Sequence, residues 1–209
     1  GTFTSITAYD QVDIYFEQDL DGSPLTVTTD TRQSRDIRGV SQELRFTSPG
    51  DRRLRYILGA YAQNTDRDLD TFTTLDVCFL FPLPFCPTPP GVISGVLAPT
   101  QLNILQGEFE QSALFAQASY DITQAVELSV ALRYDEDKRE QRDLLGSRRD
   151  SATFSDFQPK ISLSWKLTPD VMLYGTYAEG YKSGAFNPPP APGQTFPLVV
   201  QQEGTDNFE

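Results

Sequence analysis

The chain has 209 residues, a formal net charge of −12 and no histidine. The acidic balance argues against nucleic acid as a partner, because phosphates require a basic surface. The length fits one large β domain or two small ones. The lack of 18 consecutive apolar residues argues against a transmembrane helix. It does not exclude a β-barrel, because apolar and polar residues alternate along barrel strands.

Stretches of alternating apolar and polar residues recur along the chain and predict β-strands. A strand points successive side chains to opposite faces, so this alternation gives one apolar and one polar face. In chain order, the predicted strands cover residues 1–10, 38–48, 53–63, 111–121, 126–138, 157–166, 171–181 and 205–209. Most are about the 9–11 residues that a tilted strand needs to cross a bilayer, and the last resembles the first half of a strand.

The connections between these strands alternate between short and long. PGD, ITQA and LTPD are short turns, whereas the other four connections run from about 20 to more than 45 residues. A soluble sandwich has no reason to place every long loop at one end, but outer-membrane barrels have short periplasmic turns and long external loops. The alternation therefore favours a transmembrane β-barrel.

The apolar strand faces are then predicted to contact lipid. The residues that we assign to this contact are Leu128, Val130, Leu132, Leu163 and Trp165. Aromatic residues fall near both rims, where amphipathic rings settle at headgroup depth. We place Phe46, Tyr120 and Trp165 at the periplasmic rim, and Tyr134 and Phe157 at the external one.

The segment YAEGYKSGAFN, residues 177–187, resembles the pattern Y-x-x-G-Y-x-S-G-x-F-N of the TonB-dependent outer-membrane receptors. The segments SQELRFTSP, ALFAQASYDIT and LRYDEDKRE, and the whole of residues 154–187, follow the barrel of the same family in order. The stretches 13–37 and 64–110 match it only in general character.

The resemblance implies an all-β fold in which residues 1–209 form about eight antiparallel strands of a 22-stranded barrel in the bacterial outer membrane. Such receptors hold an N-terminal plug and import ferric siderophores, haem, cobalamin or other scarce nutrients. Energy reaches them from TonB through an N-terminal box. The chain begins at Gly1 and lacks the plug and the box, so we expect an excised piece whose inward residues Arg45, Arg133 and Lys160 would face the plug or the lumen.

Cys78 and Cys86 lie close together in a Pro-rich stretch. We favour a disulfide formed in an oxidising compartment, with free thiols as the alternative. The enclosed segment carries Phe79, Phe81 and Phe85, which could form an apolar knob that contacts an aromatic ligand. The same rings could instead pack against a neighbouring loop or the plug.

The sequence offers little catalytic chemistry. It has no histidine and no nucleophile motif, and EGYKSG lacks the spacing of a phosphate-binding loop. The acidic runs 17–22 and 64–70 resemble calcium loops, but Leu69 stands where such a loop needs Gly. We therefore expect solvated turns there, a solvated loop start at residues 135–143, no enzyme activity, and no metal or cofactor.

Two alternatives stay open at this point. The first is a self-contained eight-stranded outer-membrane barrel. The second is a soluble β-sandwich or lectin-like binding module.

Overall fold

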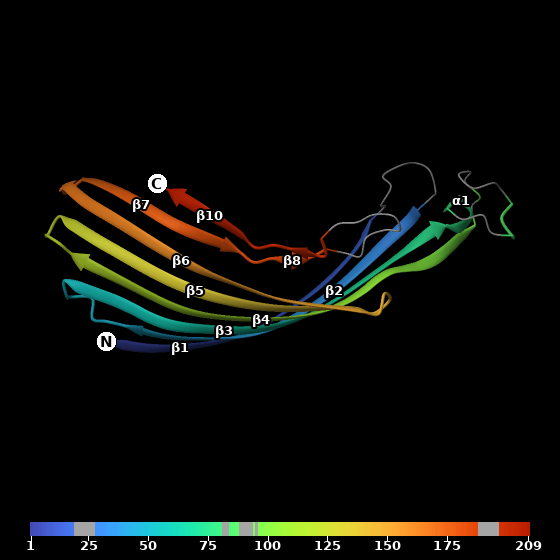
Figure 1. Cartoon of the computed structure of the whole chain (residues 1–209), viewed down its shortest axis with the longest axis horizontal. Coiled ribbons are helices and arrows are strands. Elements are labelled where there is room, and N and C mark those ends of the chain that lie inside the picture. Colours follow the sequence, from blue (N-terminus) through green and yellow to red (C-terminus); the bar gives the residue numbers. More distant parts are fainter. Residues whose placement is uncertain (19–27, 81–83, 88–93, 95, 188–196) are drawn as a thin grey trace.

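One antiparallel sheet of eight strands dominates the fold (Figure 1). The computed structural model describes residues 1–18, 28–80, 84–87, 94, 96–187 and 197–209. The strands, in spatial order, are β1 (Thr2–Gln18), β2 (Thr28–Thr47), β3 (Leu54–Asp76), β4 (Leu97–Asp121), β5 (Val126–Asp143), β6 (Arg148–Thr168), β7 (Val171–Lys182) and β10 (Glu203–Phe208). The prediction of about eight antiparallel strands in an all-β fold is confirmed.

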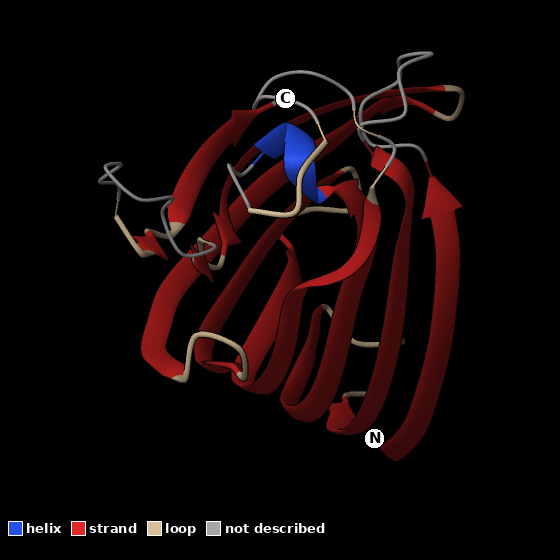
Figure 2. Ribbon diagram, turned by 90° about the vertical axis from the view of Figure 1, so that its right-hand side faces the viewer, coloured by secondary structure: helices blue, strands red, loops and turns tan. Residues whose placement is uncertain are grey.

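The sheet is a curved wall with two open edges (Figure 2). Within the described strands, β1 pairs only with β2, and β10 pairs only with β7. The wall does not close on itself, so the chain does not form a self-contained eight-stranded barrel. A sandwich requires two stacked sheets, whereas the only other sheet among the described residues pairs β8 (Ala185–Phe186) with β9 (Val199–Val200).

Most of the sequence that we predicted as long external loops is strand. β1 and β2 continue through residues 11–18 and 28–37, and β3 and β4 through residues 64–76 and 97–110. Only residues 144–147 connect β5 to β6. The loop boundaries that we predicted at these three connections were wrong, because the strands continue well past the stretches that we predicted as strand. The fourth predicted loop, between β7 and β10, remains a long connection. The backbone ladder persists in the extensions, although a clear alternation of apolar and polar residues is absent from residues 28–37 and 64–76.

The strands are joined at their other ends by tight turns, as predicted. The Thr123 hydroxyl accepts hydrogen bonds from the Ala125 and Val126 amides, at 3.1 and 3.0 Å, which closes the turn between β4 and β5. The Ser48 hydroxyl accepts one from the Tyr56 amide at 2.8 Å between β2 and β3. The one helix described is α1 (Val77–Leu80); no helix in the described part of the chain is long and apolar enough to cross a membrane.

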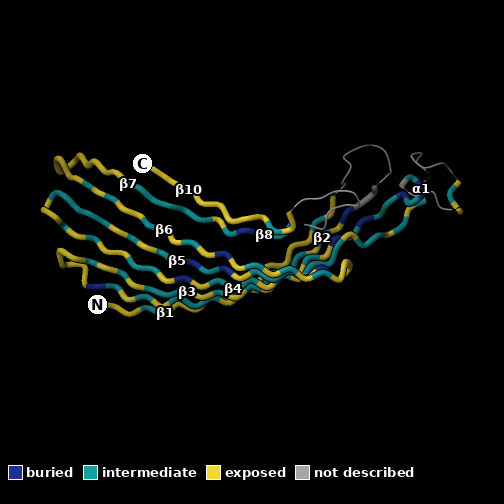
Figure 3. The backbone as a smooth tube through the Cα atoms, viewed as in Figure 1, coloured by how far each residue is buried: buried dark blue, intermediate teal, exposed yellow. Residues whose placement is uncertain are grey.

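Few of the described residues are buried, and most are intermediate or exposed (Figure 3). Hydrophobic side chains are therefore largely exposed rather than gathered in a core. Among the described residues, the buried hydrophobic ones are Cys78, Ala113 and Phe154. In contrast, Leu114 is 65% exposed and Trp165 is 49% exposed. A sheet with so much apolar surface and so little core needs an apolar environment outside itself.

Two glycines allow close approaches on the inner face of the wall. A Cβ placed on Gly59 would lie 2.1 Å from the ring of Phe115 on β4, directly opposite in the register. A Cβ on Gly184, just before β8, would lie 2.3 Å from the Phe154 ring and from the Val200 carbonyl oxygen. The β8–β9 hairpin therefore packs onto the inner face of β6.

Pro159 marks the point where β7 separates from β6. Pro159 lies opposite Leu132 in the β5–β6 register, and the β6–β7 pairing ends at Lys160, the next residue. Proline cannot donate a ladder hydrogen bond. Its position next to the end of the β6–β7 ladder agrees with this missing hydrogen-bond donor.

Candidate ligand-binding face

The outer face of the wall carries an apolar belt. The register places Leu128 opposite Leu163, Val130 opposite Ile161, and Val126 opposite Trp165. Val130, Leu132, Leu163 and Trp165 are 37–49% exposed, and Leu128 is half-buried. All five residues that we predicted to contact lipid thus share one face, and their contact with lipid stays a prediction.

The belt ends at a pair of aromatic residues. Tyr134 on β5 lies opposite Phe157 on β6, and the next outward pair is Glu136 and Ser155. Beyond this level, the outward side chains of β3 are Asn64, Asp66, Asp68 and Asp70. At about 3.3 Å per residue, residues 63–76 extend about 45 Å past the belt. The wall therefore continues well beyond the zone suited to lipid.

The inner face is polar and concave. Side chains converge on the concave side of a curved sheet, and the most buried side chains of β4 and β5 belong to this face: Ala113, Asp135 and Asp137 are 5%, 2% and 4% exposed. Asp135 accepts two 2.7 Å hydrogen bonds from Arg133 and one of 2.8 Å from Gln158. The prediction that residues 135–143 begin a solvated loop was therefore wrong. The run is strand, and its alternate acids are buried.

The three basic residues predicted to face the lumen are only partly brought together. Arg45 pairs with Glu43 two residues earlier on β2, and β3 and β4 separate it from Arg133. Lys160 lies diagonally across from Arg133 on β6, is exposed, and forms no ion pair with a described residue. Their contact with a plug stays a prediction.

Most inner-face arginines pair with a carboxylate. Arg139 on β5 bonds to Asp137 at 2.9 and 3.2 Å, and Arg55, near the tight turns, lies 2.6 Å from Asp121 and 2.5 Å from Glu127. For Arg45, Arg133 and Arg139, the acid stands two residues away on the same strand, so it shares their face. This i, i+2 spacing is a sequence signal that we did not use.

Arg35 on β2 and Arg67 on β3 differ from these. Arg35 lies opposite Leu69, and Ile37 lies opposite Arg67, so the two arginines are diagonal neighbours on the inner face. Among the described residues, neither forms a salt bridge with a carboxylate. Arg35 bonds to the Gln33 side-chain oxygen at 2.8 Å and lies 5.7 Å from the centre of the Phe16 ring.

On the inner face, two hollows adjoin Arg67. One, of about 180 Å³, is lined by Arg67, Leu69, Leu105, Gly107, Phe109, Gln141 and Phe186, the last from the β8–β9 hairpin. The other, of about 300 Å³, is lined by Gln63, Thr65, Arg67, Phe109, Gln111, Asp137 and Arg139. The Arg139 guanidinium lies 5.4 Å from the centre of the Phe109 ring. A cation, aromatic rings and amide side chains thus surround both hollows.

A third hollow, of about 470 Å³, lies on the outer face. It is lined mainly by outward residues of β1 to β5, among them Thr7, Gln42, Ala62 and Ser112. These residues lie just past the level where the apolar belt ends, and the hollow lies on the outside of the wall, away from the concave face. The inner face beyond the belt is therefore the better candidate for binding a water-soluble ligand.

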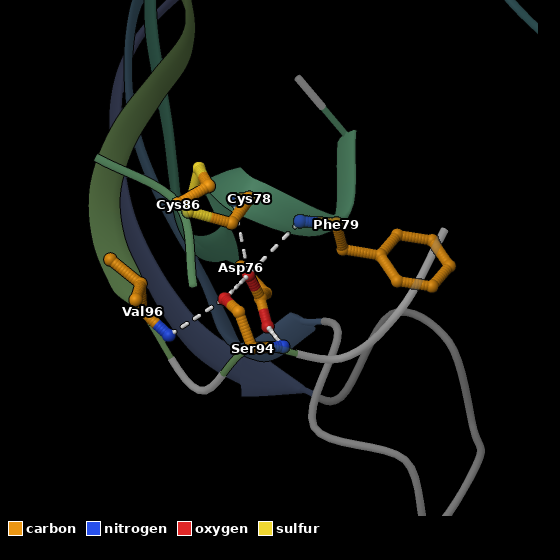
Figure 4. The surroundings of a disulfide bond; sticks show 6 residues. All are labelled: Asp76, Cys78, Phe79, Cys86, Ser94 and Val96. Atoms are coloured by element: carbon orange, nitrogen blue, oxygen red, sulfur yellow. Dashed lines mark hydrogen bonds between the residues drawn. A yellow bond between two sulfur atoms is a disulfide. The ribbon is translucent and has the colours of Figure 1, made fainter. Parts of the chain in front are cut away.

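A disulfide joins Cys78, in α1, to Cys86, at the far tip of the β3–β4 hairpin (Figure 4). Asp76 anchors this tip: its carboxylate accepts hydrogen bonds from the Cys78 and Phe79 amides, each at 3.1 Å, and from the Ser94 amide at 2.7 Å. Sequence reasoning missed Asp76, although an Asp directly before a helix is a common cap. Ser94 follows it too distantly to be recognised as a partner.

The aromatic residues of this tip are only partly described. Phe85 is 67% exposed, Phe79 is half-buried, and Phe81 lies outside the described residues. Their contact with a ligand stays a prediction.

The acidic run 64–70 lies within β3 and is not the turn that we predicted. Its acids point outward, where the Gln106 side chain donates to Asp68 at 3.2 Å and the Gln101 side chain donates to Asp70. No group of three or more metal-ligating side chains occurs in the described ranges. Most of the other run, residues 17–22, lies outside them.

The comparisons with known proteins agree with this geometry. A family model described as TonB-dependent receptor-like β-barrel matches residues 1–209. The ferric yersiniabactin uptake receptor FyuA from Yersinia pestis is similar at 19% identity and a TM-score of 0.68, over 99% of this chain and 29% of that chain.

Two structures from Acinetobacter baumannii are also similar. The siderophore receptor PiuA has 14% identity and a TM-score of 0.62, over 87% of this chain and 30% of that one. The ferric preacinetobactin receptor BauA has 16% identity and a TM-score of 0.60, over 99% and 32%. The chain spans about three tenths of the length of these structures. At such identities, the likeness shows the fold alone.

Proposed function

Because the chain belongs to the TonB-dependent receptor-like β-barrel family, we propose that it forms part of the wall of an outer-membrane receptor. This receptor takes up a ferric siderophore or a similar scarce nutrient. Its partners are outer-membrane lipid, the nutrient, and TonB, which acts through a part of the receptor outside this sequence. The role is binding and transport, not catalysis.

The observation that supports this proposal most strongly is that the outer face of the wall changes from apolar to polar along the strands. Near the tight turns, the wall has an apolar outer face and a polar inner face, as a barrel strand in a bilayer requires. Past Tyr134 and Phe157 the outer face turns polar, but the ladder of hydrogen bonds continues. The extension would line the entrance of the closed barrel, where a nutrient arrives from outside.

Uptake by the full-length receptor tests the proposal. A strain that lacks the gene is grown under iron limitation with single ferric siderophores, and the gene is then restored. We expect one of these chelates to support growth only with the receptor and only while TonB is present. Growth that is indifferent to the receptor for every chelate, together with unchanged uptake of radioactive iron, would contradict it.

A further inference from the structure

We propose that Arg35 and Arg67 together bind an anionic, oxygen-rich group of the imported ligand. This inference rests on the proposed function and specifies the ligand chemistry at one place on the inner wall. The site consists of the two guanidinium groups and the hollows beside Arg67.

The lack of acidic partners is the first reason. The chain has 29 acidic and 17 basic residues, so carboxylates are plentiful. The other described inner-face arginines of β2 to β5, namely Arg45, Arg55, Arg133 and Arg139, each have one. The residues two positions from Arg67 are Thr65 and Leu69, and those two from Arg35 are Gln33 and Ile37. The sequences of both β2 and β3 therefore provide no acid two residues from Arg35 or Arg67.

The cost of this arrangement is the second reason. Burial and the positive charge of Arg35 hold the pKa of the Arg67 guanidinium below its ordinary value. On the inner face, the one described carboxylate that lines a hollow with Arg67 is that of Asp137, which already bonds to Arg139. Asp66, Asp68, Glu108 and Glu140 line a further hollow with Arg67, but the register places their side chains on the outer face. Two like charges placed side by side, one of them partly buried, are unfavourable without a counter-ion. A bound anion would remove that penalty.

The surroundings specify the kind of anion. A guanidinium forms paired hydrogen bonds with planar carboxylates and stacks on aromatic faces. Phe16 lies beside Arg35, and Phe109 and Phe186 line the hollow beside Arg67. The site thus fits a planar carboxylate or phenolate group carried by a larger chelate.

The position of the pair favours a ligand over an internal partner. Arg67 lies about 17 Å along β3 beyond Ala62, where the apolar belt has ended. The inner wall at this height faces the external entrance. A carboxylate from another part of the receptor is the competing occupant, and the experiment distinguishes the two.

Bromide serves as the probe, because it reports an anion site whatever the natural ligand. Crystals of the full-length receptor are soaked in bromide, and its anomalous signal is located in the wild type, Arg67→Ala and Arg142→Ala. Arg142 is the matched control, because it lies in the same extension, directly before Asp143, but points outward.

We expect bromide within hydrogen-bond distance of both guanidinium groups in the wild type and in Arg142→Ala, and none in Arg67→Ala. A carboxylate of the receptor seated on both arginines would overturn the inference, as would a wild-type site without bromide. Neither result depends on the uptake assay, so failure of this inference is distinguishable from failure of the proposed function.

Binding of the chelate that the receptor imports gives the second readout. We expect Arg35→Ala and Arg67→Ala each to weaken its binding about tenfold or more, since a hydrogen bond to a charged group is typically worth at least that factor. Arg67→Lys should restore part of the loss, and Arg142→Ala should stay within about twofold. Equal binding by Arg67→Ala and the wild type would overturn the inference.

Discussion

Tyr134 and Phe157 lie directly opposite each other on β5 and β6, and they are the last outward pair before the outer face turns polar. Aromatic rings prefer the headgroup depth of a bilayer. Under the proposed function, the pair marks the external boundary of the membrane on these strands, and the extensions beyond it lie outside the bilayer.

A charge placed on the outer face below this boundary should prevent stable insertion. We expect Val130→Arg to destabilise the full-length receptor by about 2–4 kcal/mol, as lipid-facing arginines do near the bilayer midplane. The control is Gln117→Arg on the inner face, which should change stability by less than about 1 kcal/mol. Urea titration of the receptor refolded in vesicles measures both; equal losses would argue against lipid on the outer face.

Removing Arg139 and removing Arg67 should have different effects on the stability of the receptor. Arg139→Ala leaves the buried Asp137 without its charged partner and should cost about 1–3 kcal/mol. Arg67→Ala removes a cation that repels Arg35 and has no carboxylate partner among the described residues, so stability should stay the same or rise. Thermal unfolding of the ligand-free receptor in detergent checks this contrast. A large loss with Arg67→Ala would mean that another part of the receptor pairs with Arg67.

A side chain at position 59 should clash with the Phe115 ring and destabilise the receptor. A Cβ at position 59 would lie 2.1 Å from the Phe115 ring, so Gly59→Val should destabilise the receptor by about 1–3 kcal/mol, as overpacking does. Phe115→Ala in the same chain should restore much of that loss. A double-mutant cycle in urea gives the coupling, and additive losses would show that the ring does not lie over Gly59.

The tip of the β3–β4 hairpin should loosen without the Asp76 carboxylate. Asp76→Ala removes the acceptor of the Cys78, Phe79 and Ser94 amides. We expect these amides to exchange hydrogen faster, by about tenfold or more for each 1.4 kcal/mol of lost protection, while β5 is unaffected. Unchanged exchange at the tip would mean that the disulfide alone holds it.

The strand faces could be read from the sequence because apolar and polar residues alternate along these strands. Val126, Leu128, Val130 and Leu132 carry that contrast in their spacing, and the register confirms that they share a face. The extensions could not be read this way. Residues 64–76 are mostly polar on both faces, and only their cross-strand partners in β2 and β4 show that they are strand.

The candidate site was hidden for a related reason. Whether two arginines on different strands are neighbours depends on the register of those strands, so the sequence did not show that Arg35 and Arg67 are adjacent. Only their adjacency on β2 and β3 reveals two neighbouring cations. The i, i+2 spacing of acids and arginines would have indicated the exception, since neither Arg35 nor Arg67 has an acid two residues away.

Nitroxide scanning along β6 tests the central claim, that this wall faces lipid on one side and water on the other. Single labels are placed at positions 151–166 of the full-length receptor in vesicles, and collisions with oxygen and with a water-soluble nickel complex are measured. From Phe157 to Trp165, oxygen accessibility should alternate, high at Leu163 and Trp165 and low at Ser162 and Ser164. At residues 151–155, nickel accessibility should be high on the outer face. Uniform nickel accessibility from 157 to 165 would contradict the account.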